Sequence, residues 1–229
     1  MSLYKPKNSP YYQYDFEWRG HRFSGTTKCT SRRERVRELV GDEGERLESA
    51  TPEDYLPFFE FVRISGCRKK ECVFLRWTEV NWNTRQIVKL GKGGKRVVVP
   101  ITNAIRSILE PLQGHNSEFV FTRIAKRTCN REIRGRRYPL TLWGVNSAWK
   151  RLREKAGVVG FRFHDFRHDL GTKLLRKTGN LKLTQRALNH SDIKSTLRYA
   201  HVLDSEVAEA LEDFAESRKK SRTLHRKSA

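Results

Sequence analysis

Apolar and polar side chains alternate near the N-terminus, and this pattern predicts two neighbouring strands. Between residues 12 and 18 every second side chain is aromatic and those between them are polar, which is the period of a strand with one buried face. Arg19-Gly20 is a turn signal, and residues 21–27 read as a second strand with Phe23 on the same apolar face. We therefore expect a small β-unit within the first 34 residues.

From about residue 35 the spacing of apolar side chains becomes helical. Leu39 and Leu47 fit a helix over residues 36–50, and Pro52 marks the entry to the apolar run of residues 55–64, which we expect in the core. Further helices are predicted over residues 67–77, 101–112, 142–156, 164–178, 183–188 and 192–201, and over an amphipathic segment containing Val207, Leu211 and Phe214.

A glycine-rich segment in the middle of the chain predicts a hairpin. Residues 86–90 and 95–99 read as short strands, and Gly91, Gly93 and Gly94 lie in the turn between them. Because helical patterns dominate elsewhere, the sequence predicts an α+β fold: a mostly helical domain with a small antiparallel sheet, preceded by the N-terminal β-unit.

The composition points to a polyanionic partner. The 229 residues include 47 Lys+Arg and 26 Asp+Glu, a formal net charge of +21. A charge of this size opposes compaction unless an anion meets it, and nucleic acid phosphates are the anions that Lys and Arg commonly bind. A basic ribosomal-type protein, or a merely soluble one, is the alternative that charge alone leaves open. The hydrophobic fraction of 37% still supports a folded core.

The cysteines and the terminus bear on location. Cys29, Cys67, Cys72 and Cys129 form no C-x-x-C pair and no zinc spacing, so we interpret them as thiols in a reducing compartment. No apolar stretch approaches a membrane span, and the N-terminus lacks the apolar core of a signal peptide. We expect no metal site, no membrane partner and a cytoplasmic, nucleoid-associated protein.

Six residues have ordinary structural explanations when each is taken alone. An arginine with an acid three residues on is usually a surface ion pair, a lysine at a glycine-rich tip is usually solvated, and histidines beside helix ends or tyrosines on amphipathic helices are usually structural. Only their order and local context together indicate chemistry. The six are Arg68, Lys92, His164, Arg167, His190 and Tyr199.

Five separate segments around these residues resemble the motifs of tyrosine recombinases. Residues 65–77 have the G-x-R-x-x-E-x-x-x-L-x-W form of the first arginine box, and residues 92–100 resemble the hairpin lysine with its V-P strand. The H-x-x-R box, the L-G-H-S segment and the tyrosine box are matched in turn by residues 164–168, 188–191 and 196–201. The resemblance covers roughly residue 35 to the end and implies the recombinase catalytic fold.

Two positions depart from the family pattern. Asn189 stands where glycine is usual before His190, and asparagine tolerates the left-handed backbone conformation better than most residues do. Asp169 is unexpected after the second histidine of the H-x-x-R box, and we expect no consequence from it.

The residue types suit the transfer of a phosphodiester between two alcohols. The hydroxyl of Tyr199 is a workable nucleophile and leaving group, because a phenol pKa of about 10 lies well below that of an alkyl alcohol. Arg68 and Arg167 can each fork onto non-bridging oxygens and stabilise developing charge.

The remaining three positions can supply a hydrogen bond to the phosphate and the two proton transfers. His190 can donate a hydrogen bond to the phosphate, His164 is the expected general base toward Tyr199, and Lys92 is the expected general acid for the 5′-oxygen. The resemblance implies a 3′-phosphotyrosine intermediate and a free 5′-hydroxyl, with no cofactor.

Residues 1 to about 34 resemble the arm-binding module of some phage integrases, a three-stranded sheet leading into a helix; a generic hairpin with core aromatics is the simpler alternative. We thus expect an N-terminal module at 1–34 and a catalytic domain at 35–229. The stretch between Ser31 and Arg68 has room for only two helices, so the family's core-binding domain is expected to be absent. The residues expected to bind DNA are Arg19, Arg22, Lys28, Lys95 and Arg96.

The sequence therefore favours a site-specific recombinase that acts on double-stranded DNA as a homotetramer. Two other functions stay open: relaxation of DNA in the manner of a type IB topoisomerase, and regulation of DNA by a non-catalytic relative of integrases. A non-catalytic regulator would have no need of the tyrosine at position 199.

Overall fold

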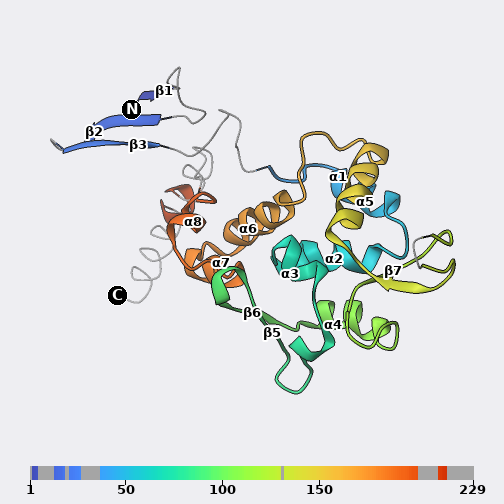
Figure 1. The fold of residues 1–229 in the computed structure, drawn as a ribbon. Coiled ribbons are helices and arrows are strands. Elements are labelled where there is room, and N and C mark those ends of the chain that lie inside the picture. The colour runs from blue at the N-terminus through green and yellow to red at the C-terminus, as the bar shows by residue number, and fades with distance from the viewer. Residues whose placement is uncertain are drawn as a thin grey trace, which may run out of the picture.

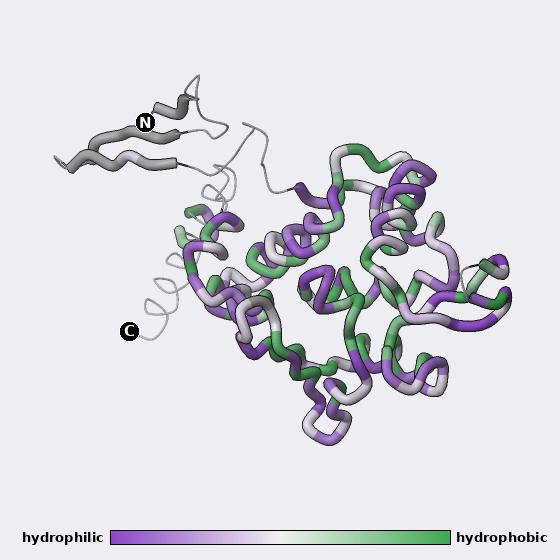
Figure 2. The backbone as a smooth tube through the Cα atoms, viewed as in Figure 1, coloured by the Kyte–Doolittle hydropathy of each residue, from purple (hydrophilic) through white to green (hydrophobic). Residues whose placement is uncertain are grey.

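A computed structural model describes residues 2–4, 13–18, 21–26, 37–129, 132–200 and 211–215 (Figure 1). Helices and small antiparallel sheets make up this part of the chain, which confirms the predicted α+β class. In Figure 2 hydrophobic and hydrophilic positions alternate along most helices, as expected for elements with one buried face. None of the described helices is both long and apolar enough to cross a bilayer.

The N-terminal unit is a three-stranded antiparallel sheet. Strands β2 (Gln13–Trp18) and β3 (His21–Thr26) pair as predicted, with Phe16 opposite Phe23. Strand β1 (Ser2–Tyr4) adds to the other edge of β2; its sequence carried no strand pattern, although the family resemblance implied a third strand. Of the residues expected to bind DNA here, Arg22 lies on β3 opposite Glu17, and Arg19 and Lys28 lie outside the described residues.

The first helix is shorter than predicted. Helix α1 spans Glu43–Ala50, whereas residues 37–40 are not helical. Gly41, with a φ of 53°, interrupts the helical path, and Asp42 is the N-cap. The backbone N–H of Leu39 instead donates to Asp169 at 2.9 Å.

Helix α2 (Leu56–Ser65) forms the centre of the core. Phe58, Phe59 and Phe61 are almost fully buried, and their rings pack among aromatic residues from other segments. Phe58 meets Phe121 edge-on at 5.4 Å between centroids, and Phe59 meets Trp149 at 5.7 Å. Such aromatic contacts add to the hydrophobic free energy of burial.

Helix α3 (Lys69–Val73) also stops short of its predicted end. A 3-10 turn at Trp77–Glu79 follows it, and the chain then enters strand β4 (Val80–Asn81). The predicted hairpin is confirmed: β5 (Gln86–Leu90) and β6 (Arg96–Pro100) pair antiparallel with Leu90 opposite Arg96, and β4 completes a sheet in the order β4-β5-β6.

The remaining elements surround this core (Figure 1). They are α4 (Asn103–Leu109), the 3-10 turn Glu110–Leu112, the hairpin of β7 (Thr122–Ile124) and β8 (Arg137–Pro139), α5 (Leu142–Lys155), α6 (Asp165–Thr178), α7 (Leu181–Ala187) and α8 (Lys194–Leu197). Residues 211–215 are helical. The β7–β8 hairpin was not predicted, and α8 is much shorter than the predicted helix over residues 192–201.

Candidate active site

The turn between α2 and α3 positions Arg68. Gly66 ends α2 with a φ of 64°, and a Cβ there would lie 3.0 Å from Leu188 and 3.1 Å from Leu170, so conformation and packing both require glycine. Two residues later, the backbone N–H and the guanidinium of Arg68 donate to Glu71 at 2.7 and 3.0 Å. The predicted ion pair is thus present, and it orients an arginine whose side chain is 39% exposed.

Arg167 is buried where three segments meet. Its two terminal nitrogens donate to the carbonyl oxygens of Gly66 and Leu188, so this α6 side chain binds the end of α2 and the end of α7. Burial lowers the pKa of Arg167, and the nearby charge of Arg68 lowers it further. The two guanidinium groups are therefore close enough to repel one another, and an anion shared between them would be stabilised.

Tyr199 lies in the same site and is only 4% exposed. Its ring stacks against that of His190, with centroids 6.2 Å apart and planes 9° from parallel. Burial raises the pKa of the Tyr199 hydroxyl, and the positive charges of Arg167 and Arg198 oppose this effect. The structure therefore brings together four of the predicted catalytic residues, Arg68, Arg167, His190 and Tyr199.

The loop after α7 holds His190 in place. The ring Nδ1 of His190 lies 2.8 Å from the hydroxyl of Thr196, which is fully buried. Burial lowers the pKa of His190 to about 4, and the charges of Arg167 and then Arg68 act in the same direction. The ring is consequently neutral near pH 7 and faces a positively charged site.

Asn189 connects this loop to the sheet. Its φ of 49° confirms the expectation that asparagine adopts the left-handed conformation here. Its side chain accepts a hydrogen bond from the N–H of Val98 and donates one to the Val98 carbonyl, both at 3.1 Å. Since Val98 lies on the edge strand β6, the asparagine amide extends the β-ladder to the residue before His190.

Asp169 does have a structural consequence, contrary to our expectation. Its carboxylate accepts the hydrogen bond from the N–H of Leu39 at 2.9 Å and pairs with Lys173 at 2.8 Å. It thereby joins the segment before α1 to helix α6. The sequence position alone gave no sign of this contact, because its partner lies 130 residues away.

His164, the expected general base, lies at the start of α6, one helical turn before His168. It is the N-cap residue of α6 and is exposed, and no hydrogen bond among the described residues joins it to Tyr199. The ring nitrogen at the Tyr199 hydroxyl belongs to His168, whose Nδ1 is 2.8 Å away. The two histidine rings lie one helical turn apart and contact each other edge-on, with centroids 4.7 Å apart.

The β5–β6 hairpin borders the site from the other side. Its tip is a 3-10 turn over Lys92–Gly94, in which Gly93 and Gly94 have φ values of 73° and 70°. A cleft of about 610 Å³ separates this hairpin from α7 and the His190 loop. Lys95 and Arg96, both expected to bind DNA, are exposed and line it.

Helix α7 contributes basic residues that the sequence analysis missed. Lys182 and Arg186 line the same cleft from one face of the helix, as their i,i+4 spacing requires. Between them lies Gln185, whose side-chain oxygen is buried without a hydrogen-bond partner in the described part of the chain. Every charged residue that lines this cleft is basic, so it is suited to a polyanion.

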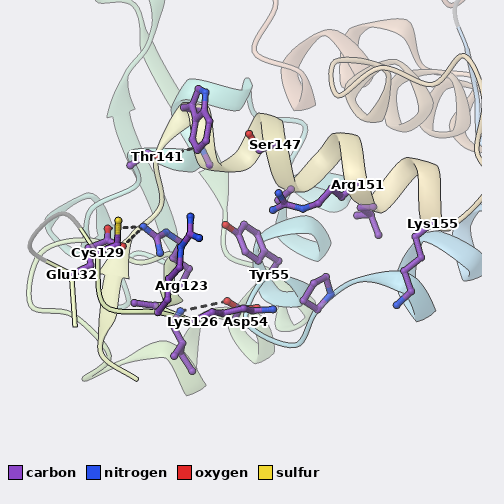
Figure 3. A pocket seen from close by; sticks show the side chains of 18 of the residues that line it. Asp54, Tyr55, Arg123, Lys126, Cys129, Glu132, Thr141, Ser147, Arg151 and Lys155 are labelled. Atoms are coloured by element: carbon purple, nitrogen blue, oxygen red, sulfur yellow. Dashed lines mark hydrogen bonds and ion pairs between the residues drawn. The ribbon is translucent and has the colours of Figure 1, made fainter. Parts of the chain in front are cut away.

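A larger hollow of about 700 Å³ lies elsewhere, between the β7–β8 hairpin and α5 (Figure 3). Arg123 in this hollow pairs with Glu132 at 2.6 Å, and Tyr55, Ser147 and Arg151 surround it. None of the six predicted catalytic residues lines it, so its size does not make it the active site.

Comparison with known proteins agrees with this geometry. Residues 37–206 match the model of the phage integrase family. The chain belongs to the phage integrase family. The tyrosine recombinase XerC of Pediococcus pentosaceus is 26% identical over 161 residues, which cover 69% of this chain and 53% of that protein. The chain spans about half the length of the curated relatives it matches.

Solved structures of a site-specific recombinase and of a phage integrase share the fold. The XerH site-specific recombinase bound to its difH substrate, in a pre-cleavage complex, has a TM-score of 0.56 at 20% identity and covers 81% of this chain and 55% of that one. The catalytic domain of bacteriophage HP1 integrase has a TM-score of 0.52 at 18% identity and covers 76% of this chain and 93% of that one. The predicted family and fold class are confirmed.

Proposed function

We propose that this chain carries the catalytic domain of a site-specific DNA recombinase that cuts and rejoins DNA through a covalent bond between Tyr199 and a 3′-phosphate. The observation that carries this proposal is the convergence of four side chains in one site: Arg68 at the N-cap of α3, Arg167 on α6, His190 in the loop after α7 and Tyr199 just after α8. Membership of the family supports the same chemistry.

In the proposed reaction His164 takes the proton from the hydroxyl of Tyr199. The phenol oxygen bonds to phosphorus, and the bond from phosphorus to the 5′-oxygen breaks. Arg68 and Arg167 donate to the non-bridging oxygens, and His190 adds a further donor. Lys92, on the glycine-built hairpin tip, gives the leaving 5′-oxygen its proton. Rejoining reverses these steps with a 5′-hydroxyl as nucleophile, and the phosphodiester energy is conserved in the tyrosyl ester, so the reaction needs no cofactor.

The proposed partner is double-stranded DNA, to which the protein binds as a homotetramer. The all-basic cleft beside Arg68 and His190 and the net charge of +21 support a polyanion. The Tn1549 transposon integrase, which is similar in fold, was solved in complex with circular intermediate DNA. Affinity that depends on phosphate contacts falls steeply as salt rises.

A pool of nicked duplexes with randomised inverted repeats tests the proposal. Cleavage beside a nick releases a short strand, so rejoining fails and the covalent protein–DNA adduct accumulates. We expect adducts enriched in one sequence with the wild-type protein and none with Tyr199→Phe, which should fold and bind the same DNA.

The outcomes separate the functions that the sequence left open. Adducts spread evenly over unrelated sequences would indicate relaxation of the topoisomerase kind. Tight DNA binding by the wild-type protein without any adduct would contradict the proposal and favour a non-catalytic regulator.

A further inference from the structure

Asn189 links the two sides of the basic cleft directly. Its side-chain amide accepts a hydrogen bond from the N–H of Val98 and donates one to the Val98 carbonyl, both at 3.1 Å. Val98 lies on β6 at the edge of the sheet β4-β5-β6, where outward backbone groups have no neighbouring strand to pair with. The amide takes the place of such a strand. Glycine, the residue usual at this position in the family, has no side chain that could do so.

The His190 side of this link is held in place without the asparagine side chain. The backbone N–H of Asn189 donates to the carbonyl of Arg186, and that of His190 donates to the carbonyl of Gln185, both at 3.0 Å. The ring Nδ1 of His190 lies 2.8 Å from the hydroxyl of Thr196. Loss of the amide would therefore leave His190 where it is.

Other contacts fix the base of the hairpin, but in a different direction. Val97 and Val99 bury their side chains in the core, and Nζ of Lys89 donates to the carbonyl of Glu71 at 2.8 Å. Side chains stand perpendicular to a sheet, whereas the hydrogen bonds between strands lie in its plane. The buried valines thus fix the height of β6 over the core, and the Asn189 amide fixes where β6 lies across the cleft.

The tip of the hairpin has few contacts of its own. Leu90 and Arg96 form the last pair of the β5–β6 ladder, and both are exposed. Among the described residues, the two bonds to Asn189 are the only hydrogen bonds that join residues 93–98 to a segment outside the hairpin. Lys92 begins the turn at this tip, so the place of the turn relative to His190 depends on how β6 is held.

We propose that Asn189 is a positioning residue that fixes the distance between the hairpin of Lys92 and the His190 loop, and so places the general acid at the leaving 5′-oxygen. The proposal rests on the function proposed above and adds a residue that the family pattern does not contain. Asn189 makes and breaks no covalent bond and transfers no proton. The proton still passes from Lys92 to the 5′-oxygen, and the amide acts only through β6.

A substrate with sulfur in place of the scissile 5′-oxygen tests this role. A thiolate leaves without a proton, so its departure does not depend on the general acid, although cleavage still requires the groups that bind the phosphate. Asn189→Gly keeps the left-handed backbone and removes both bonds to Val98. On the nicked duplex enriched by the wild-type protein, we expect Asn189→Gly to cleave about tenfold more slowly than the wild type, a part of the effect of a general acid. On the matching sulfur duplex its rate should lie within about twofold of the wild type.

Asn116→Gly is the matched control for lost stability. The side-chain oxygen of Asn116 accepts from the backbone N–H groups of Glu118 and Phe119 at 3.0 and 2.8 Å, so this substitution also removes two hydrogen bonds. Asn116 does not line the basic cleft. Asn116→Gly should lower stability about as much as Asn189→Gly does, and at a temperature where both are folded it should cleave both duplexes at the wild-type rate.

A double-mutant cycle asks whether the amide acts through Lys92. In a Lys92→Ala background no general acid is left to misplace, so adding Asn189→Gly should change cleavage of the ordinary duplex by less than about twofold. Independent action of the two residues would instead multiply their separate losses.

The proposal fails if Asn189→Gly cleaves the ordinary duplex at the wild-type rate, because the link then has no effect on catalysis. It also fails if Asn189→Gly is equally slow on both duplexes, or if its loss multiplies that of Lys92→Ala, because groups other than the general acid are then displaced. Each of these results leaves the proposed function standing. A wild-type protein that forms no adduct on any duplex overturns the proposed function itself, and with it any effect of Asn189 on catalysis.

Discussion

Arg68 and Arg167 carry the same charge but are held in different ways. Arg68 is partly exposed and oriented by Glu71, whereas Arg167 is buried and donates to two backbone carbonyls. Lysine would keep the charge of either residue and lose the planar fork. We therefore expect Arg68→Lys to reduce cleavage by about 100-fold and to change DNA affinity only slightly.

Arg167→Lys should reduce cleavage as strongly and also destabilise the fold, because one ammonium cannot satisfy both the Gly66 and Leu188 carbonyls. Denaturant unfolding should show a loss of about 2 kcal/mol for this variant and almost none for Arg68→Lys. Arg186→Lys, in the basic cleft, is the control. Equal losses of cleavage and binding in all three variants would mean that these arginines act only as DNA anchors.

The depressed pKa of His168 makes stability depend on pH. Its pKa in the folded protein is about 4 because of burial, below the ordinary value of 6.5, so the unfolded chain binds the proton more tightly. The stabilisation is complete above pH 6.5 and is lost as the pH falls toward 4. Between pH 7 and pH 4.5 we expect the free energy of unfolding to fall by about 2 kcal/mol more in the wild type than in His168→Asn. Urea titrations at each pH measure this free energy. The same pH dependence of the free energy of unfolding in both proteins would contradict the prediction.

Sequence reasoning identified the residue types of the site but not which ring meets the nucleophile. His164 and His168 are four residues apart and share one helix face, so periodicity cannot separate them. The choice depends on where the chain returns 31 residues later with Tyr199, which is a property of tertiary packing. The left-handed Asn189, in contrast, followed from local backbone preference alone.

At the level of elements, the β5–β6 hairpin carries the predicted general acid. A substrate whose scissile 5′-oxygen is replaced by sulfur needs no proton on the leaving group, because a thiolate leaves readily. Lys92→Ala should therefore cleave an ordinary substrate poorly and the sulfur substrate at nearly the wild-type rate. Lys95→Ala, on the same hairpin, should cleave the ordinary substrate at nearly the wild-type rate. If Lys95→Ala, and not Lys92→Ala, is defective on the ordinary substrate and recovers on the sulfur substrate, the general acid is Lys95.

The contact between Asn189 and Val98 joins this hairpin to the His190 loop. Asn189→Gly restores the residue usual in the family and keeps the left-handed conformation, but it removes two hydrogen bonds. We expect a loss of 1–2 kcal/mol of stability, at about 1 kcal/mol per bond, and faster amide exchange at Val98. Ser191→Gly, at an exposed neighbouring position, is the control for the backbone freedom that glycine adds. If Asn189→Gly leaves the amide exchange rate of Val98 unchanged, the hydrogen bonds between Asn189 and Val98 do not join the two segments.

Element identities were more predictable than their limits. The core run at residues 55–64 and the β5–β6 hairpin follow directly from apolar spacing and turn glycines. The start of α1 was wrong because the Gly41-Asp42 break overrides the spacing of Leu39. Strands β7 and β8 were missed because three-residue strands are too short to show an alternating pattern.

At the scale of the whole molecule, the final helical segment is a predicted assembly element. Leu211 is 63% exposed, so its side chain is not buried in the described core. Glu206, Glu209, Glu212 and Asp213 make this segment acidic in an otherwise basic chain, which suits docking on a basic neighbour. Truncation after Leu203 should preserve single-site cleavage and abolish the multimeric complex on a two-site DNA in native gels. A truncated protein that unfolds, or that no longer cleaves a single site, would show that the segment stabilises its own domain.

The central claim is that Tyr199 becomes covalently joined to DNA, and mapping of the trapped adduct tests it most directly. The adduct from the nicked-duplex experiment is digested with protease and nuclease, and the modified peptide is sequenced by mass spectrometry. We predict one modified peptide, with a 3′-linked nucleotide on the Tyr199 oxygen. A nucleotide on any other residue, or a 5′ linkage to Tyr199, would contradict the account.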